Sequence, residues 1–382
     1  MFSYVETENS AKIKVVGVGG AGGNAVNNMI TNNLQGVQYI VANTDLQALD
    51  SSKAEKKIQI GEQLTSGLGA GADPQVGRDA AHETSSVLKA ALGESHMVFI
   101  TAGFGGGTGT GAAPVIAGLC KELGILTVAV VTRPFKFEGL KRARVAEEGI
   151  AKLKGLADTV ITIPNNRLLG LASKETTLLE MFKLADEVLL HSVKGITDLI
   201  IRPGLVNLDF ADVRTTMAKA GMALMGIGIA RGENRALDAA ERAISHPLLE
   251  DVKIDGAKGV LMNITSSSDL TMDEMAKSSD RIHKEVGDKA EIIWGSVIDD
   301  DMADEIRITV IATGIEDIRK GEKPPNPKDY TLGRKYRHSK SPDNTNYDLP
   351  TFQRMKDTDN QSGERFDKED LDLPTFLRRK AD

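Results

Sequence analysis

Apolar and polar positions alternate between two patterns along the first 165 residues of the chain. Short, nearly continuous runs of β-branched and other apolar residues predict strands buried on both faces, and the segments between them have helical periodicity. The predicted strands are residues 13–19, 37–44, 97–103, 126–132 and 160–165. This order predicts an α/β fold with a mostly parallel sheet and helices on both faces.

A long helix and a smaller region follow. Apolar residues recur at helical spacing from about Thr176 to Ile201 on several faces, which predicts a long central helix ended by Pro203 and Gly204. Beyond it the pattern predicts a smaller α+β domain that ends near Ile315. Its predicted strands are 222–230, 259–266, 290–298 and 305–314, and its predicted helices are 233–245 and 271–287.

The last 67 residues are polar, contain proline and are poor in large apolar groups, so we expect them to be disordered. The expected organisation has six parts. They are a flexible N-terminal segment (1–12), a nucleotide-binding domain (13–175), a central helix (176–202), an α+β domain (203–315), a linker (316–369) and a C-terminal peptide (370–382).

Charge and cysteine content exclude some functions. Lys and Arg number 47 against 54 Asp and Glu, a net charge of −7, which argues against general nucleic-acid binding. Cys120 is the only cysteine, so there is no disulfide framework or CxxC site, and a reducing compartment is expected. We expect neither a signal peptide nor a transmembrane segment.

Glycine-rich turns follow two of the predicted strands. Gly17, Gly19 and Gly22 satisfy GxGxxG, and Asp45 lies 23 residues beyond Gly22, so a Rossmann oxidoreductase is one interpretation. A second turn, GFGGGTGTG at 103–111, repeats the strand–glycine–helix arrangement. Two such turns can surround a chain of phosphates, whereas a dehydrogenase needs one.

Neither turn contains the GK[ST] of a Walker A motif. Phosphate charge must therefore be met by backbone amides, helix dipoles and a metal ion. A third glycine cluster, GLGAGAD at 67–73, could close over the terminal phosphate.

Five motifs together resemble the FtsZ family of bacterial tubulin-like division GTPases. The motifs are GGAGGN at 19–24, ANTD at 42–45, GGGTGTG at 105–111, RPFKFEG at 133–139 and NLDFAD at 207–212. The resemblance covers roughly residues 11–315 and the C-terminal peptide. It implies a tubulin-like GTPase fold, GTP and GDP as ligands, and Mg²⁺ as counter-ion.

The resemblance also implies the nucleotide contacts. The phosphates and base would lie over Gly20, Ala21, Gly22, Gly23 and Asn24, and the β- and γ-phosphates would be wrapped by Gly107, Thr108 and Gly109. Glu138 and Arg142 resemble the family's sugar and phosphate contacts; spacing alone favours an i,i+4 surface ion pair. Phe182 would stack on the base and Asp186 would accept from guanine, although core packing also explains Phe182.

The motif NLDFAD has two interpretations. In the simpler one, Asp212 caps the following helix and Asp209 is a loop acid. The resemblance implies instead that Asn207, Asp209 and Asp212 reach the γ-phosphate held by a neighbouring subunit and orient the attacking water. Assembly would then activate hydrolysis and build head-to-tail filaments in the cytoplasm, as a ring at the midcell division site.

Two similar peptides occur in the last 36 residues. The C-terminal peptide resembles the family's tail, which binds membrane tethers and regulators; its contact residues would be Leu371, Asp372, Leu373, Pro374, Phe376, Leu377 and Arg378. A near copy, YDLPTFQRMK, lies at 347–356. The second copy is either a further binding peptide or a relic of duplication.

Three functions are therefore weighed. An assembly-activated GTPase of the division ring explains all the motifs. An oxidoreductase explains only the first glycine turn. A nucleotide-binding structural relative that scarcely assembles or hydrolyses GTP is disfavoured by the presence of Asp209 and Asp212.

Overall fold

The fold is taken from a computed structural model. The expected tail with its two peptides, and the site residue Asn207, lie outside the residues that it describes. The described residues are 11–173, 175–202, 204–206, 208–218, 221–249, 254, 256–287 and 290–315.

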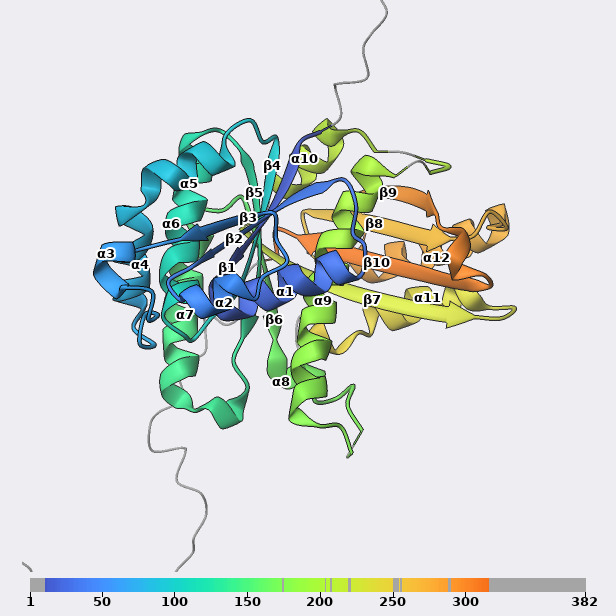
Figure 1. Ribbon diagram of the computed structural model, residues 1–382. Coiled ribbons are helices and arrows are strands. Elements are labelled where there is room, and N and C mark those ends of the chain that lie inside the picture. The colour runs from blue at the N-terminus through green and yellow to red at the C-terminus, as the bar shows by residue number, and fades with distance from the viewer. Residues whose placement is uncertain are drawn as a thin grey trace, which may run out of the picture. The chain divides into compact units, whose positions relative to one another are not determined.

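One ten-stranded sheet runs through these residues in the order β3-β2-β1-β4-β5-β6-β7-β10-β8-β9 (Figure 1). The strands from β3 to β7 in this order pair in parallel, and β10 pairs antiparallel with both β7 and β8. The expected mostly parallel α/β fold is confirmed. The strands are β1 (Ile13–Val18), β2 (Val37–Asn43), β3 (Lys56–Gln59), β4 (Met97–Gly103), β5 (Leu126–Arg133), β6 (Thr159–Pro164), β7 (Gly221–Arg231), β8 (Gly259–Ser266), β9 (Glu291–Ile298) and β10 (Glu305–Thr313).

Both faces of the parallel strands are covered by helices. In β4, Met97 and Phe99 pack with α1 and α9, while Val98 and Ile100 pack with α4 to α7 on the other face. This alternation is the reason that the strands read as continuous apolar runs. The helices in this part are α1 (Gly19–Thr31), α2 (Leu46–Asp50), α3 (Glu62–Thr65), α4 (Pro74–Glu83), α5 (Ser85–Leu92), α6 (Thr108–Glu122), α7 (Leu140–Lys154) and α8 (Asn165–Leu168).

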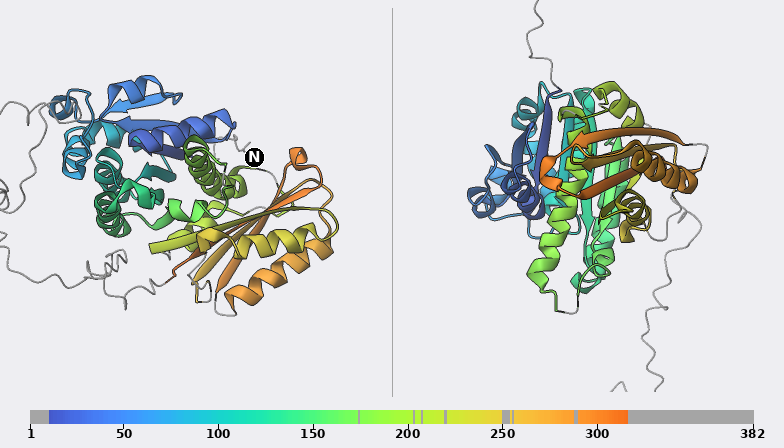
Figure 2. Two further views of the ribbon diagram at one scale, coloured as in Figure 1. Left: turned by 90° about the horizontal axis from the view of Figure 1, so that it is seen from below. Right: turned by 90° about the vertical axis from the view of Figure 1, so that its right-hand side faces the viewer.

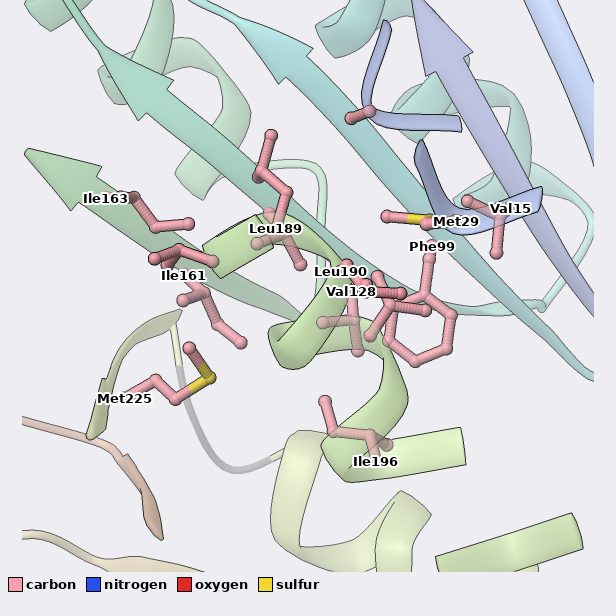
Figure 3. Close-up of a cluster of buried hydrophobic side chains, with 14 of the residues drawn as sticks. Val15, Met29, Phe99, Val128, Ile161, Ile163, Leu189, Leu190, Ile196 and Met225 are labelled. Atoms are coloured by element: carbon pink, nitrogen blue, oxygen red, sulfur yellow. The ribbon is translucent and has the colours of Figure 1, made fainter. Parts of the chain in front are cut away.

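The long helix α9 (Leu178–Ile201) lies between the N-terminal elements and the C-terminal strands (Figure 2). It begins with a capping box, in which Thr177 and Glu180 satisfy each other's backbone amides. Its Leu189, Leu190 and Ile196 point into the core between the strands and α1 (Figure 3). At 24 residues α9 is ~36 Å long, so it reaches from one end of the parallel strands to the other.

The C-terminal strands carry their own helices. Helices α11 (Arg235–Ile244) and α12 (Met272–Val286) enclose a third apolar cluster against β7, β8 and β10, and α10 (Phe210–Ala218) connects α9 to β7. The sequence pattern missed β3, since only Ile58 of its four residues is buried and no alternation develops. No helix among the described residues combines the length and apolar character needed to span a bilayer.

Candidate nucleotide site and acidic loop

The two glycine turns occupy the point where the chain reverses direction across the sheet. Strand β1 pairs with β2 on one side and with β4 on the other. The strand order therefore runs outward in one direction from β1 and in the opposite direction from β4. The carboxyl ends of β1 and β4 lie side by side; β1 leads directly into α1, and β4 leads into α6 through residues 104–107. Ligands of open α/β sheets bind at such a switch point.

The glycines of the first turn divide into two groups. A Cβ on Gly17 would lie 2.4 Å from the Gly22 carbonyl oxygen, and one on Gly22 would lie 2.4 Å from the Thr101 carbonyl oxygen, so these glycines permit close packing of α1 on the strands. Gly20 differs, because a Cβ there would meet nothing within 4 Å. The backbone at Gly20 is therefore open to a ligand.

Neither α1 nor α6 has a side-chain cap. Val18 and Gly107 occupy the N-cap positions and provide no hydrogen bond, and neither helix has an acidic residue in its first turn. By contrast, Asp45, Asp73 and Thr177 cap α2, α4 and α9. The free first-turn amides and the positive dipole ends of α1 and α6 suit an anion such as phosphate.

The second turn touches both the first turn and the 67–73 cluster. A Cβ on Gly19 would lie 3.0 Å from the Gly109 amide nitrogen, and one on Gly107 would lie 2.8 Å from Ala70 Cβ. The hydroxyls of Thr44 and Thr108 are 2.7 Å apart and hydrogen-bonded. The structure thus brings all three glycine-rich segments to one place, with no lysine or arginine in any of them.

An aromatic cluster lies at the N-terminal part of α9. Phe182 is 41% exposed and meets the buried ring of Phe135 edge-on at a centroid distance of 5.6 Å. Core packing therefore accounts for part of the Phe182 ring, and the rest is open to solvent. One turn along α9, burial and the neighbouring Glu187 raise the pKa of Asp186 to about 7.

Glu138 and Arg142 form the ion pair that their spacing predicts, with Arg142 Nη1 donating to Glu138 Oε2 at 2.6 Å. Glu138 Oε1 also accepts from the Phe135 amide at 2.8 Å. The Glu138 side chain is only 16% exposed, against 53% for Arg142, so the guanidinium has room for a second partner. Arg142 borders the second glycine turn, since a Cβ on Gly105 would lie 3.0 Å from its carbonyl oxygen.

The acidic loop caps α10 through Asp209, and not through Asp212 as in the simpler of the two interpretations. Asp209 Oδ1 accepts from the Asp212 amide at 2.8 Å, so Asp209 is the cap and Asp212 is the third helical residue. The interpretation of Asp212 as the cap is wrong, because a capping side chain reaches forward to an amide two or three residues later. Both side chains are exposed.

Helix α10 lies at the opposite end of the sheet from the glycine turns. Phe210 contacts His96, which precedes β4, and the Met217 carbonyl accepts from Thr159, the first residue of β6. In Figure 1, α10 is at the upper end of the view, while α8, which follows the carboxyl end of β6, is at the lower end. The six to eight residues of β1, β4 and β5 put the two ends of these strands ~20 Å apart.

Sequence reasoning did not single out two residues that the structure places at the turns. Thr44 belongs to the ANTD motif, yet its partner Thr108 is 64 positions away, so no local signal joins them. Phe135 belongs to the RPFKFEG motif and packs against Phe182, which lies 47 positions further along the chain. In the same motif as Thr44, Asp45 Oδ1 accepts from the amides of Gln47 and Ala48 as the cap of α2, which gives it a structural role.

This switch point with two uncapped glycine turns defines a tubulin-like GTPase domain. The family model "Tubulin/FtsZ family, GTPase domain" matches residues 12–173, and "FtsZ family, C-terminal domain" matches 221–316. The chain belongs to the FtsZ family: it is a GTP-binding cell division protein with GTPase activity.

Full-length relatives and solved structures agree with this family. The chain is 50% identical over 387 residues to cell division protein FtsZ of Coxiella burnetii, with 99% of each chain covered, and 48% identical over 396 residues to that of Pseudomonas aeruginosa, with 100% covered. The FtsZ dimer of M. jannaschii superposes with a TM-score of 0.77 at 45% identity, covering 81% of this chain and 89% of that one. A protofilament structure of CetZ2 from Haloferax volcanii, at 21% identity and a TM-score of 0.68, shares the fold.

Proposed function

We propose that the chain assembles head to tail into filaments of the bacterial division ring, and that the loop Asn207–Asp212 of one subunit completes the GTPase site of the next. One observation carries the proposal: the glycine turns and the acidic residues lie at opposite ends of the same sheet. Over ~20 Å, Asp209 and Asp212 cannot reach a phosphate bound at the glycine turns of their own chain.

Stacking the amino end of one sheet on the carboxyl end of the next solves this separation. Such a contact is heterologous and does not close, so its repetition builds a filament and each contact completes one active site. The solved relatives include an FtsZ dimer and a CetZ2 protofilament, which supports assembly of this kind.

The nucleotide would be held by its phosphates and its base at separate places. The first-turn amides of α1, from Gly20 to Gly22, and of α6, from Thr108, would bind the phosphates, with Gly23 and Asn24 following along α1. Phe182 would stack on the base. The Asp186 carboxylate would accept from guanine N1–H and the 2-amino group, a donor pair that adenine lacks.

Hydrolysis needs a positioned water. Asp209 and Asp212 of the adjacent subunit would accept hydrogen bonds from water and orient its oxygen toward the γ-phosphorus. The new P–O bond forms as the bond to the β-phosphate oxygen breaks, giving GDP and inorganic phosphate, with the water proton passing to solvent or phosphate. Positioning and charge stabilisation account for most catalysis of phosphoryl transfer, so a donated loop is sufficient.

Magnesium fits this site as a phosphate-bound ion. No group of three acidic, histidine or cysteine side chains that could hold a metal occurs in the described part of the chain. Mg²⁺ commonly keeps several waters and binds mainly to substrate phosphates, where it neutralises their charge. The hydroxyls of Thr44 and Thr108, hydrogen-bonded to each other at the turns, are oxygen donors available to such an ion.

Loss of the γ-phosphate would weaken the subunit contact and drive filament turnover during septum formation at midcell. The C-terminal peptide 370–382 would bind membrane tethers and regulators, so contact with the membrane would be indirect.

GTP hydrolysis per subunit, measured against protein concentration with Mg²⁺ present, tests the proposal. We expect a threshold followed by a rise, and no rise for Asp212→Ala. Activity that stays constant with concentration would show catalysis within one chain and would contradict the proposal. Equal GTP affinity of the variant and the parent chain serves as the control for folding.

A further inference from the structure

His96 is an exposed residue just before β4, and the backbone of two neighbouring segments holds it in place. Its amide donates to the Lys12 carbonyl at 2.9 Å, and its carbonyl accepts from the Leu126 amide at 3.2 Å. Its ring nitrogen Nδ1 also accepts from the Lys12 amide, at 2.9 Å. His96 is therefore tied to the residues that begin β1 and β5, so the sheet fixes the direction of the imidazole ring.

The fixed ring of His96 lies against Phe210, the first residue of α10. The two ring centroids are 6.1 Å apart and the ring planes are tilted by 58°, an arrangement that aromatic rings favour. Because Nδ1 accepts a hydrogen bond, the proton of the neutral imidazole is placed on Nε2. The sheet thus presents a ring of fixed direction to the start of α10.

Phe210 lies between the two acids of the acidic loop. Asp209 precedes Phe210 and caps α10 by accepting from the Asp212 amide at 2.8 Å, and Asp212 follows in the first turn. A shift of the backbone at Phe210 would therefore move both carboxylates together.

The other end of α10 is fixed to the sheet. Val213, Thr216 and Met217 are buried. The Met217 carbonyl accepts from the Thr159 hydroxyl, and the Thr216 carbonyl accepts from the Thr313 hydroxyl at 3.4 Å. The nine residues of α10 span ~14 Å, so a rotation of ~10° about the last turn would displace the first turn by ~2 Å.

Such a displacement matters for catalysis, because misplacing a catalytic group by ~1 Å can cost ~10²-fold in rate. Phe210 is half-buried and packs against the apolar cluster that includes Val213 and Met217. The His96 ring is a second support for Phe210, and it belongs to the GTPase domain. The contact thus connects the start of α10 to the strands that carry the glycine turns at their other end.

We propose that His96 is a positioning residue of the shared GTPase site. Its ring supports Phe210 and thereby fixes the direction in which Asp209 and Asp212 point toward the adjacent subunit. The inference rests on the proposed function, because the hydrolysis that His96 influences takes place on the nucleotide of the next subunit. The contact requires a ring at position 96 and does not require the Nδ1 acceptor.

Two substitutions in the full chain separate the ring from its hydrogen bond. His96→Phe keeps a ring against Phe210 and loses the acceptor for the Lys12 amide, whereas His96→Asn keeps an acceptor and loses the ring. Hydrolysis is measured at saturating GTP with Mg²⁺ and divided by the amount of sedimented filament. We expect the rate per assembled subunit to fall ~10-fold for His96→Asn and by less than ~3-fold for His96→Phe.

Two controls accompany these variants. The GTP affinity of the unassembled chain and the midpoint of thermal unfolding should be unchanged, because His96 lies at the opposite end of the sheet from the glycine turns and is exposed. His82→Asn is the matched control: His82 is an exposed histidine on α4, and its replacement should leave the rate unchanged.

A double-mutant cycle tests whether His96 acts through Phe210. His96→Asn and Phe210→Leu should each lower the rate per assembled subunit. The double variant should lose little more than Phe210→Leu alone, because both substitutions remove the same contact. Losses that multiply would show that His96 acts independently of Phe210 and would overturn the proposal.

Two further results would also overturn it. Equal losses for His96→Asn and His96→Phe would assign the effect to the hydrogen bond with Lys12. Less filament with an unchanged rate per assembled subunit would make His96 an assembly contact alone.

Asp212→Ala, measured alongside, separates this inference from the proposed function. Full hydrolysis by Asp212→Ala would overturn both. Loss of hydrolysis by Asp212→Ala together with a normal rate for His96→Asn would overturn only the role of His96.

Discussion

The two ends of the parallel strands carry complementary halves of one chemistry. At the carboxyl ends of β1 and β4, glycine turns present free amides and contain no basic side chain. Beside the amino ends of β4 and β6, Asp212 on α10 and its capping residue Asp209 are exposed. In the proposed function, the first end holds the polyphosphate and the second orients water.

If the proposed function holds, this difference makes a single chain an incomplete enzyme. Helix α9 is long enough to span the distance between the two ends, from Phe182 and Asp186 near its start to Ile201 at its end. Under the proposed function, this separation makes hydrolysis depend on contact between subunits.

The largest expected effect is at the acidic end. Asp212→Ala should lower the rate of GTP hydrolysis ~10²-fold or more, because the attacking water loses its orienting carboxylate, while GTP affinity stays unchanged. Steady-state phosphate release and GTP titration measure the two quantities. A variant that loses both equally would indicate that Asp212 acts within its own subunit.

Asp209 needs a paired design because it also caps α10. Asp209→Asn keeps an oxygen that accepts from the Asp212 amide but removes the charge, whereas Asp209→Ala removes both. We expect similar losses of hydrolysis from the two variants, and a loss of ~1 kcal/mol in the free energy of unfolding only for Asp209→Ala. Full activity of Asp209→Asn would assign Asp209 a structural role alone.

At the carboxyl ends of the strands, substitutions of two glycines distinguish an effect on ligand binding from an effect on packing. Gly20→Ala adds a methyl group into open space, so the free energy of unfolding should not change while GTP affinity falls ~10-fold, about 1.4 kcal/mol. Gly111→Ala should instead destabilise the fold by ~1–3 kcal/mol, because its Cβ would meet Pro74. Isothermal titration measures GTP affinity, and thermal unfolding measures stability. Normal GTP affinity of Gly20→Ala would show that the phosphates do not bind over Gly20.

Asp186 gives the nucleotide end a pH dependence. With a pKa of about 7, the Asp186 carboxylate that we propose accepts from guanine becomes protonated as the pH falls, so GTP affinity should drop ~10-fold between pH 8 and pH 6. Asp186→Asn should abolish this dependence. The stability of the fold should change with the opposite sign, because burial disfavours the charged form of Asp186. As the pH rises from the ordinary aspartate pKa of 3.8 toward 7, the contribution of Asp186 to the free energy of unfolding therefore falls.

The smallest effect concerns Arg142. Arg142→Ala should weaken GTP binding ~3- to 10-fold through loss of a phosphate contact and change the free energy of unfolding by no more than ~0.5 kcal/mol. Arg144→Ala is the matched control, since Arg144 forms the same i,i+4 pair with Glu148 on the same helix. Equal GTP affinities of the two variants would make Arg142–Glu138 a surface ion pair only.

Much of the fold could be predicted because its signals are local. The apolar runs of β1, β4 and β5 need no distant information, and the glycine turns directly follow their strands. Strand β8 agrees with its predicted bounds to the residue. Strand β3 was missed because, at the edge of the sheet, it buries one side chain.

The details of the site depend on contacts between distant residues. The hydrogen bond between Thr44 and Thr108 and the ring contact between Phe135 and Phe182 exist only after the sheet has formed. The role of Asp209 as cap depends on where α10 begins, within one residue, which composition does not determine. The separation of the glycine turns from the acidic residues depends on two features. The sequence pattern indicates the direction of the strands, but it does not indicate where α10 packs.

A mixing experiment tests the shared active site most directly. Asp212→Ala retains the nucleotide end, and Gly20→Val, which fills the open space above the α1 amides, retains the acidic end. In an equal mixture above the assembly threshold, the account predicts GTP hydrolysis at about a quarter of the parent rate, since one contact in four pairs an intact acidic end with an intact glycine turn. Hydrolysis no higher than the average of the two variants measured separately would contradict it.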